Sequence, residues 1–472
     1  MRDQKSHPNE DGPRQAWANG NIDLARRLTK DRLQHLIAHP GHAQVRADSG
    51  ALEHLQLLLH LGLIDQAESF MRTLHDVPTE LSLPFYLLDK VVQCCRIPFR
   101  ISQVDVRDEA VFAVLPVWGD TYLDLWEHGG LVAFANDAAM PLYENRNFEF
   151  HVYTRPRDLS RLRAMAGMDK LTEHTTVRYF NLELILGAHR RRGLDAMNIA
   201  HWTTFTLSKC HNAHMLFLFA DMIYSGRSLT NLSQKIRDDR YDLLLMLDPQ
   251  LGKRGWANIK RQTNEKSGFS TELMIAAFLQ DPSTRDLGWR IDPDEKVVPA
   301  RPIRINRITE TTAELRTVLP QPLFISNCLS HRMAIPSPTG FDLFVVEAAL
   351  ATLNGSERMG LLVDPEEFFC MSVVPDRSSP EPRIPTSNDV IEDALINLSN
   401  MGLLGSGRHW AFQNPLLIGK TAKDKTLETI ANRFLEKQTF ESNTISEYAK
   451  YALDVLAPTY AALYAKEVSI KT

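Results

Sequence analysis

Cysteine is scarce in this chain of 472 residues, and the few cysteines form no framework. There are five, at positions 94, 95, 210, 328 and 370, and no two of them have the Cys-x-x-Cys spacing. An odd number without regular spacing argues against a disulfide scaffold and indicates reduced thiols in a cytoplasmic compartment. The same lack of Cys-x-x-Cys pairs argues against a structural zinc site.

Long apolar runs and an excess of positive charge are also missing. The 53 Lys and Arg are outnumbered by 58 Asp and Glu, which gives a net charge of -5. We therefore expect no nucleic-acid binding through phosphate contacts. The polar segment from Met1 to Arg14 does not resemble a signal peptide, and no run of about 18 apolar residues predicts a membrane span.

The common catalytic motifs are absent as well. The chain contains no Gly-x-Gly-x-x-Gly, no Walker-A loop, no Gly-x-Ser-x-Gly elbow and no His-Glu-x-x-His. Its 44% apolar and 24% charged residues are ordinary for a globular protein, and its length predicts two or three domains. The order of predicted strands and helices is therefore the main guide to function.

Residues 1–105 are predicted to be helical. Leu52, Leu55, Leu58 and Leu59 recur at helical spacing, and Leu61–Phe70 resembles half of a tetratricopeptide-type helix pair in which the small Ala67 permits close packing. Trp17–Ala25 is a weaker echo of that pattern. Two echoes are fewer than the three or so repeats that a stable solenoid needs, so a helical layer covering the next domain is an equal alternative.

Residues 106–375 alternate between predicted strands and helices. The strands are expected at 110–118, 148–154, 176–180, 214–221 and 241–247. This alternation predicts an α/β domain with a mostly parallel sheet. Seven apolar residues are expected in one core: Val111, Leu115, Phe150, Val152, Leu216, Leu218 and Leu244. Residues 376–472 are predicted to be a C-terminal helical segment.

The most informative stretch is His214–Ser225, in which six apolar residues lead towards Asp221. A continuous apolar run is typical of a buried parallel strand, and open α/β sheets bind ligands at the carboxyl ends of such strands. Asp221 is therefore our first candidate for a catalytic or ligand-binding residue. Capping of the following turn or helix is an equally strong alternative.

Two other predicted strands end in candidate substrate-binding residues. Trp118, Gly119 and Tyr122 follow the first strand, where the glycine permits close approach of a ligand and the rings can stack on a base or a sugar. Packing of these rings in the core is the commoner role. Thr154 and Arg155 end the second strand, and arginine matches the geometry of a diphosphate.

This layout resembles a GT-A-type nucleotide-sugar glycosyltransferase domain over roughly residues 108–370. It also resembles a group of uncharacterised bacterial proteins with tetratricopeptide-like helices in front. The resemblance implies that Ser225 and His331 contact substrate and that Asp221 and Asp364 contact a divalent metal. The usual Asp-x-Asp metal motif is incomplete, however, because Phe219 stands in place of its first acidic residue. The cofactor is therefore unknown, with a divalent metal left open.

Two functions follow from these expectations. The first is transfer of a sugar from a nucleotide-diphosphate donor to an acceptor, with nucleotide sugar as the ligand. The second is a catalytically silent GT-A-like scaffold that recruits a protein partner through its N-terminal helices. The missing acidic residue favours the second, whereas Trp118, Arg155 and Asp221 at the strand ends favour the first.

Overall fold

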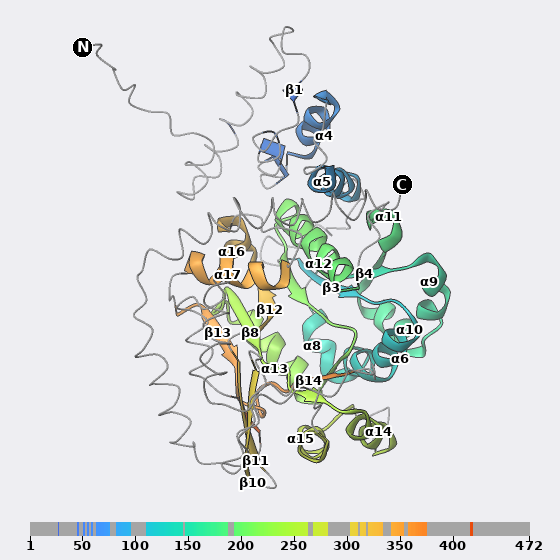
Figure 1. Ribbon diagram of the computed structural model, residues 1–472, viewed down its shortest axis with the longest axis vertical. Coiled ribbons are helices and arrows are strands. Elements are labelled where there is room, and N and C mark those ends of the chain that lie inside the picture. The colour runs from blue at the N-terminus through green and yellow to red at the C-terminus, as the bar shows by residue number, and fades with distance from the viewer. Residues whose placement is uncertain are drawn as a thin grey trace, which may run out of the picture.

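The computed structural model describes most of the region from residue 110 to 374 and isolated parts outside it (Figure 1). The described residues are 27, 45–46, 51, 54–55, 58–59, 63–75, 82–95, 110–144, 147–186, 193–262, 268–281, 303–309, 312–317, 320–333, 341–353, 357–374 and 416–418. The predicted helices of the C-terminal segment and the Trp17–Ala25 echo lie outside these residues.

A seven-stranded sheet forms the centre of the molecule, in the order β13-β8-β12-β6-β3-β4-β5. Only β12 runs antiparallel to its neighbours. The strands are β3 (Val111–Pro116), β4 (Phe148–Thr154), β5 (Thr176–Asn181), β6 (His214–Phe217), β8 (Leu243–Met246), β12 (Gln321–Ile325) and β13 (Met359–Leu362). The α/β class and the mostly parallel sheet are thus confirmed, and the antiparallel β12 between β6 and β8 was not anticipated.

Helices cover both faces of this sheet. On β4, Tyr153 bonds Thr204 of α12 (Gly193–Cys210), whereas Phe150 packs edge-on against Phe134 of α7 (Leu131–Phe134). Residues an odd number apart on a strand point to opposite faces, so α12 and α7 lie on opposite sides. The seven apolar residues predicted to share a core all belong to one buried cluster, which confirms that prediction.

The remaining helices are α6 (Asp120–Leu125), the π-helical turn η3 (Trp126–Gly130), the 3-10 turn η4 (Asp137–Ala139), α8 (Met140–Tyr143), α9 (Pro156–Arg163), α10 (Ala166–His174), α11 (Leu182–Leu186), α13 (Gly226–Arg237), α14 (Lys253–Gln262), α15 (Thr271–Gln280), α16 (Asn327–Arg332) and α17 (Phe341–Leu353). The buried apolar residues of α14 and α15 belong to a second apolar cluster beside β9 (Gln250–Leu251) and β14 (Cys370–Val373). None of the helices within the described ranges is long and apolar enough to cross a membrane.

Two smaller sheets extend the fold. One has the order β7-β14-β9 and consists of β7 (Met222–Tyr224), β9 (Gln250–Leu251) and β14 (Cys370–Val373). The other is an antiparallel sheet of β10 (Ile303–Thr309), β11 (Thr312–Thr317) and β15 (Leu416–Ile418). The pairing of β15 with β11 joins the C-terminal segment, which we predicted to be helical, to the sheet domain through a strand.

The N-terminal region contains a short parallel pair, β1 (Val45–Arg46) with β2 (Leu74–His75), and the helices α4 (Ile64–Thr73) and α5 (Ser82–Cys95). Ala67 is fully buried, and residues of both helices belong to the same apolar cluster as the large sheet. This shared core fits the alternative of a covering helical layer. One helix pair does not identify a repeat array, so the tetratricopeptide-like assignment remains a prediction.

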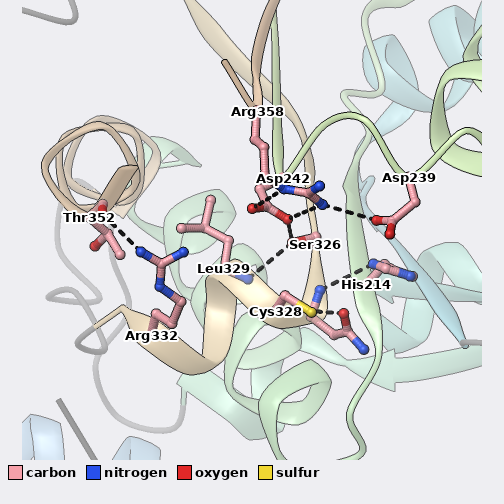
Figure 2. Close-up of polar contacts among 10 residues, drawn as sticks. His214, Asp239, Asp242, Ser326, Cys328, Leu329, Arg332, Thr352 and Arg358 are labelled. Atoms are coloured by element: carbon pink, nitrogen blue, oxygen red, sulfur yellow. Dashed lines mark hydrogen bonds and ion pairs between the residues drawn. The ribbon is translucent and has the colours of Figure 1, made fainter. Parts of the chain in front are cut away.

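A buried ion pair joins three strands at the amino edge of the sheet (Figure 2). Asp242, which is 3% exposed and precedes β8, accepts hydrogen bonds of 2.7 and 3.0 Å from Arg358, which precedes β13. It also accepts a 2.7 Å bond from Ser326 at the end of β12. Burial alone would raise the pKa of Asp242, but the bonds from Arg358 and Ser326 outweigh burial and hold the pKa below its usual value.

We predict that Asp242→Ala lowers the free energy of unfolding by about 2–4 kcal/mol, because it removes the acceptor of the Ser326 hydroxyl and of two bonds from Arg358. Asp239 is a matched control, since it bonds the same guanidinium at 3.0 Å but its side chain is 85% exposed. Asp239→Asn should change stability by less than about 1 kcal/mol, because Asn also tolerates the positive φ of 47° at this position. Urea denaturation of both variants checks this, and equal effects would contradict the assigned role of Asp242.

Candidate functional site

The candidate site lies at the carboxyl edge of the large sheet. Because β3, β4, β6 and β8 run in the same direction, the residues that follow them meet at one edge. Trp118 follows β3, Thr154 and Arg155 end β4, and Asp221 follows β6. The structure thus brings together the three strand ends that the sequence analysis singled out.

The loop after β3 has an open face at Gly119. This residue has a positive φ of 76°, which favours glycine, and no atom lies within 4 Å of the position that a Cβ would occupy. Its backbone N–H donates to the carboxylate of Asp158 at 2.9 Å, and Asp158 is buried. Asp158 is therefore a positioning residue for the loop, which the sequence analysis did not identify.

The aromatic residues of this loop contribute to the core and keep part of their surface exposed. Trp118 and Tyr122 are both half-buried and pack against the main apolar cluster, and Tyr122 also contacts the second one. Packing in the core, the commoner role for such rings, therefore applies to at least part of Trp118 and of Tyr122. The remaining surface leaves stacking on a ligand open.

The end of β4 carries polar groups that lack partners. Thr154 is 3% exposed, and its hydroxyl has no hydrogen-bond partner in the described part of the chain. Arg155 is half-buried and makes no ion pair with any residue that the structure describes. A buried hydroxyl without a partner costs free energy, so such a group is a candidate for binding a ligand or an ordered water.

A second carboxylate, Asp248, lies close to Asp221. Asp248 follows β8 as Asp221 follows β6, and the antiparallel β12 separates the two strands in the large sheet. The chain continues from Asp221 into β7 and from Asp248 into β9, and β14 pairs with both. The N–H of Val373 on β14 donates to the carbonyl of Asp221 at 2.8 Å, and the Ser372 hydroxyl donates to Asp248 at 2.8 Å.

The sequence contained a signal for Asp248 that we missed. The apolar run Leu243–Leu247 leads directly into this aspartate, as the run before Asp221 does. Strand spacing alone, however, does not show that the two carboxylates approach each other across β12. Only the pairing of β14 with β7 and β9 brings them together.

Burial perturbs both carboxyl groups. It raises the pKa of Asp221 to about 6, against a smaller opposing effect of the residue's own backbone N–H. Burial also raises the pKa of Asp248 to about 7, where the bond from Ser372 opposes the rise and the charge of Asp221 adds to it. Both carboxyl groups therefore keep their protons to a higher pH than an exposed aspartate does.

Three other predicted site residues have different surroundings. The Ser225 hydroxyl lies 2.7 Å from that of Ser228 in a buried pair at the start of α13. Asp364 follows β13 at the carboxyl edge, is exposed, and accepts a 2.9 Å bond from the N–H of Glu366. His331 lies at the opposite edge, with its Nε2 2.9 Å from the Asn212 amide oxygen near the start of β6. The structure therefore does not bring His331 together with Asp221.

The carboxylates fit a metal ion only in part. Asp221 and Asp248 offer hard oxygen ligands. Two residues after Asp248, the Oε1 atom of Gln250 is buried and has no hydrogen-bond partner among the described residues. Within the described ranges, however, no group of three or more His, Cys, Asp or Glu residues is arranged to hold a metal ion. We therefore derive no catalytic step through a metal.

Comparison with known proteins adds little beyond this geometry. No family model matches the chain, and no curated protein matches it. Among solved structures, S. aureus TarS 1-349 in complex with UDP-GlcNAc is 11% identical, with 73% of this chain and 76% of that one covered and a TM-score of 0.27. The WbbM bifunctional glycosyltransferase is 12% identical, with 73% and 52% covered and a TM-score of 0.25.

The longer S. aureus TarS structure is also 11% identical, with a TM-score of 0.24. The match covers 73% of this chain but 46% of TarS, so the chain spans about half the length of that protein. At these TM-scores the likenesses carry no argument about the ligand of this chain. The functional argument therefore depends on the residues at the carboxyl edge.

We predict that Asp248→Asn is more stable than the wild type at pH 8, by about 1–3 kcal/mol. The folded-state pKa of about 7 lies above the ordinary 3.8, so the folded protein binds more protons between these values. Its free energy of unfolding therefore falls as the pH rises through this range, and the substitution removes that loss. Asn keeps an oxygen that accepts the Ser372 bond.

Urea denaturation at pH 5 and pH 8 measures this difference, which should shrink at the lower pH. Asp364→Asn is the matched control, because this exposed carboxylate follows the neighbouring strand. Its substitution should change the free energy of unfolding little at either pH. A variant at position 248 that is less stable than the wild type at pH 8 would refute the unfavourable burial of this charge.

We also predict weak or no Mn²⁺ binding to the free protein. Phe219 replaces the first acidic residue of the usual metal motif, and two carboxylates rarely hold such an ion without substrate phosphates and waters. Isothermal titration calorimetry with MnCl₂, without nucleotide, checks this. A tight site in the free protein would contradict the prediction, and its loss in Asp248→Asn would then identify the second ligand.

Proposed function

We propose that this protein transfers a sugar from a nucleoside-diphosphate donor to an acceptor hydroxyl at the carboxyl edge of its large sheet. One observation carries the proposal. The end of β4 holds Arg155 and the Thr154 hydroxyl, neither of which has a partner among the described residues, and the ends of β6 and β8 hold two carboxylates with raised pKa values. A cation suited to phosphates and a carboxylate suited to accepting a proton thus share one edge.

The donor half of the site is assigned to β3 and β4. The Arg155 guanidinium binds the diphosphate, the Thr154 hydroxyl donates to one of its oxygens, and the exposed part of Trp118 or Tyr122 stacks on the base or the sugar. Gly119 allows the ligand to approach the backbone, because the position of its missing Cβ is open. Asp221 contacts the ribose or the sugar.

The acceptor half is assigned to Asp248. Its carboxylate, oriented by Ser372, accepts the proton of the acceptor hydroxyl while that oxygen forms a bond to the anomeric carbon. The bond from this carbon to the diphosphate breaks, and its electron pair leaves with the diphosphate, which Arg155 stabilises. A group with a pKa near 7 is suited to this task, since it is partly ionised at neutral pH.

A second function is a catalytically silent domain that binds a nucleotide sugar or recruits a partner. The observation that favours it is Phe219 at the place of the first acidic residue in the metal motif. The two functions differ in Asp248, because transfer needs a group to accept the proton whereas binding does not.

A thermal-shift screen with UDP, GDP and their sugar conjugates tests the donor site, since a ligand at 100 times its Kd stabilises by about 2.7 kcal/mol. We predict that Arg155→Gln weakens binding of the stabilising nucleotide sugar by about tenfold or more, because it removes a charged contact to phosphate. Arg163→Gln is the matched control, since this exposed side chain, eight residues away in α9, lies over the Tyr179 ring and should change binding little.

We predict that Asp221→Asn weakens binding or transfer with little change in melting temperature. If Asp221 only caps a turn, Asn replaces it without loss, and Asp221→Ala lowers stability by about 0.5–2 kcal/mol without affecting the ligand. Asp248→Asn should keep binding and lose transfer. Full transfer activity in Asp248→Asn would remove this residue as the base, and binding without transfer in the wild type would favour the silent domain.

A further inference from the structure

The helix α14 presents a cationic face to solvent. Four of its ten residues, Lys253, Arg254, Lys260 and Arg261, are cations and exposed, and the helix contains no acidic residue. Its apolar side chains point inwards, with Trp256 at 7% exposure and Ile259 fully buried in the second apolar cluster. This concentration of positive charge contrasts with the net charge of -5 of the whole chain.

Arg254 and Arg261 make no ion pair with any residue that the structure describes. Lys260 lies 3.5 Å from Asp124 and over the Trp256 ring. Arg261 bonds only to the carbonyl of Ala257 and the amide of Asn258 on its own helix, and Arg254 makes no ion pair within the described part of the chain. Arg254 and Arg261 are seven residues apart, so they lie on one face about 10 Å apart along the axis.

The helix is held beside the candidate site at both of its ends. Its first turn follows β9, and the N–H of Gly255 donates to the Asp281 carboxylate at 2.8 Å. Four residues lie between Asp248 and Lys253, so their Cα atoms are at most about 18 Å apart. Near the other end, the Lys260 contact to Asp124 joins α14 to α6, the helix that follows Gly119. Figure 1 shows α14 beside α15, at the end of the molecule away from α4 and α5.

We propose that α14 is the docking surface for an acceptor that carries repeated anionic groups, phosphates or carboxylates. The inference rests on the proposed function, since the surface flanks the edge where the acceptor hydroxyl would react. Two arginines about 10 Å apart suit charges that recur along a chain. The observations favour a dissolved polyanion over a lipid surface, because a helix that lies in a membrane exposes apolar side chains and α14 buries its own.

The test uses the full chain and measures the affinity for inorganic polyphosphate at low and moderate salt, without nucleotide. Arg254→Gln with Arg261→Gln should weaken binding by about tenfold at low salt and make the logarithmic salt dependence shallower by about one to two units. The matched control, Lys170→Gln with Arg240→Gln, removes the same charge from exposed positions elsewhere and should leave the affinity close to that of the wild type. Equal losses in the two double variants would overturn the proposal.

Two further arms identify the ligand. Binding of polyglutamate in place of polyphosphate, with the same loss in the α14 variant, assigns the surface to carboxylates, and the reverse preference assigns it to phosphates. Binding of the wild type to anionic phospholipid vesicles but to neither polymer would overturn the proposal. The nucleotide-sugar thermal shift of the α14 variant is measured separately. If the α14 variant shows a normal shift with nucleotide sugar and binds the polymers as the wild type does, only the docking surface is refuted. If nucleotide sugars stabilise neither the wild type nor the variant, the proposed function is refuted.

Discussion

The pairing of β14 with both β7 and β9 is the constraint on which the candidate site depends. Asp221 and Asp248 end strands that β12 keeps apart in the large sheet. Because β14 bonds the Asp221 carbonyl through Val373 and the Asp248 carboxylate through Ser372, it holds the two strand exits on either side of itself. Asp221 and Asp248 therefore follow strands of the large sheet, but hydrogen bonds from the small sheet hold them together.

The same arrangement opposes folding at neutral pH. Two carboxyl groups with pKa values raised to about 6 and about 7 are ionised less readily in the folded chain than in the unfolded one. Burial of residues around them, such as Tyr224 and Cys370, offsets this cost. Groups kept in unfavourable surroundings are typical of binding and catalytic sites, where function and stability conflict.

The two edges of the large sheet differ in whether their polar side chains have partners within the chain. At the amino edge, Asp242 receives bonds from Arg358 and Ser326, so its charge is neutralised and the pKa is lowered. At the carboxyl edge, Arg155 and the Thr154 hydroxyl lack partners among the described residues. Polar groups satisfied within the chain hold strands together, whereas unsatisfied ones are available to a ligand. This difference supports placing the chemistry at the carboxyl edge.

The sequence by itself determined the α/β class, the positions of the parallel strands and the strand ends at Trp118, Arg155 and Asp221. It could do so because continuous apolar runs and the residues that end them are local features. Only the tertiary structure decided that Asp248 joins Asp221, that His331 lies at the opposite edge and that Ser225 bonds Ser228. These facts follow from the antiparallel β12 and from β14, whose partners are distant in the chain, and no local pattern encodes which distant strands pair.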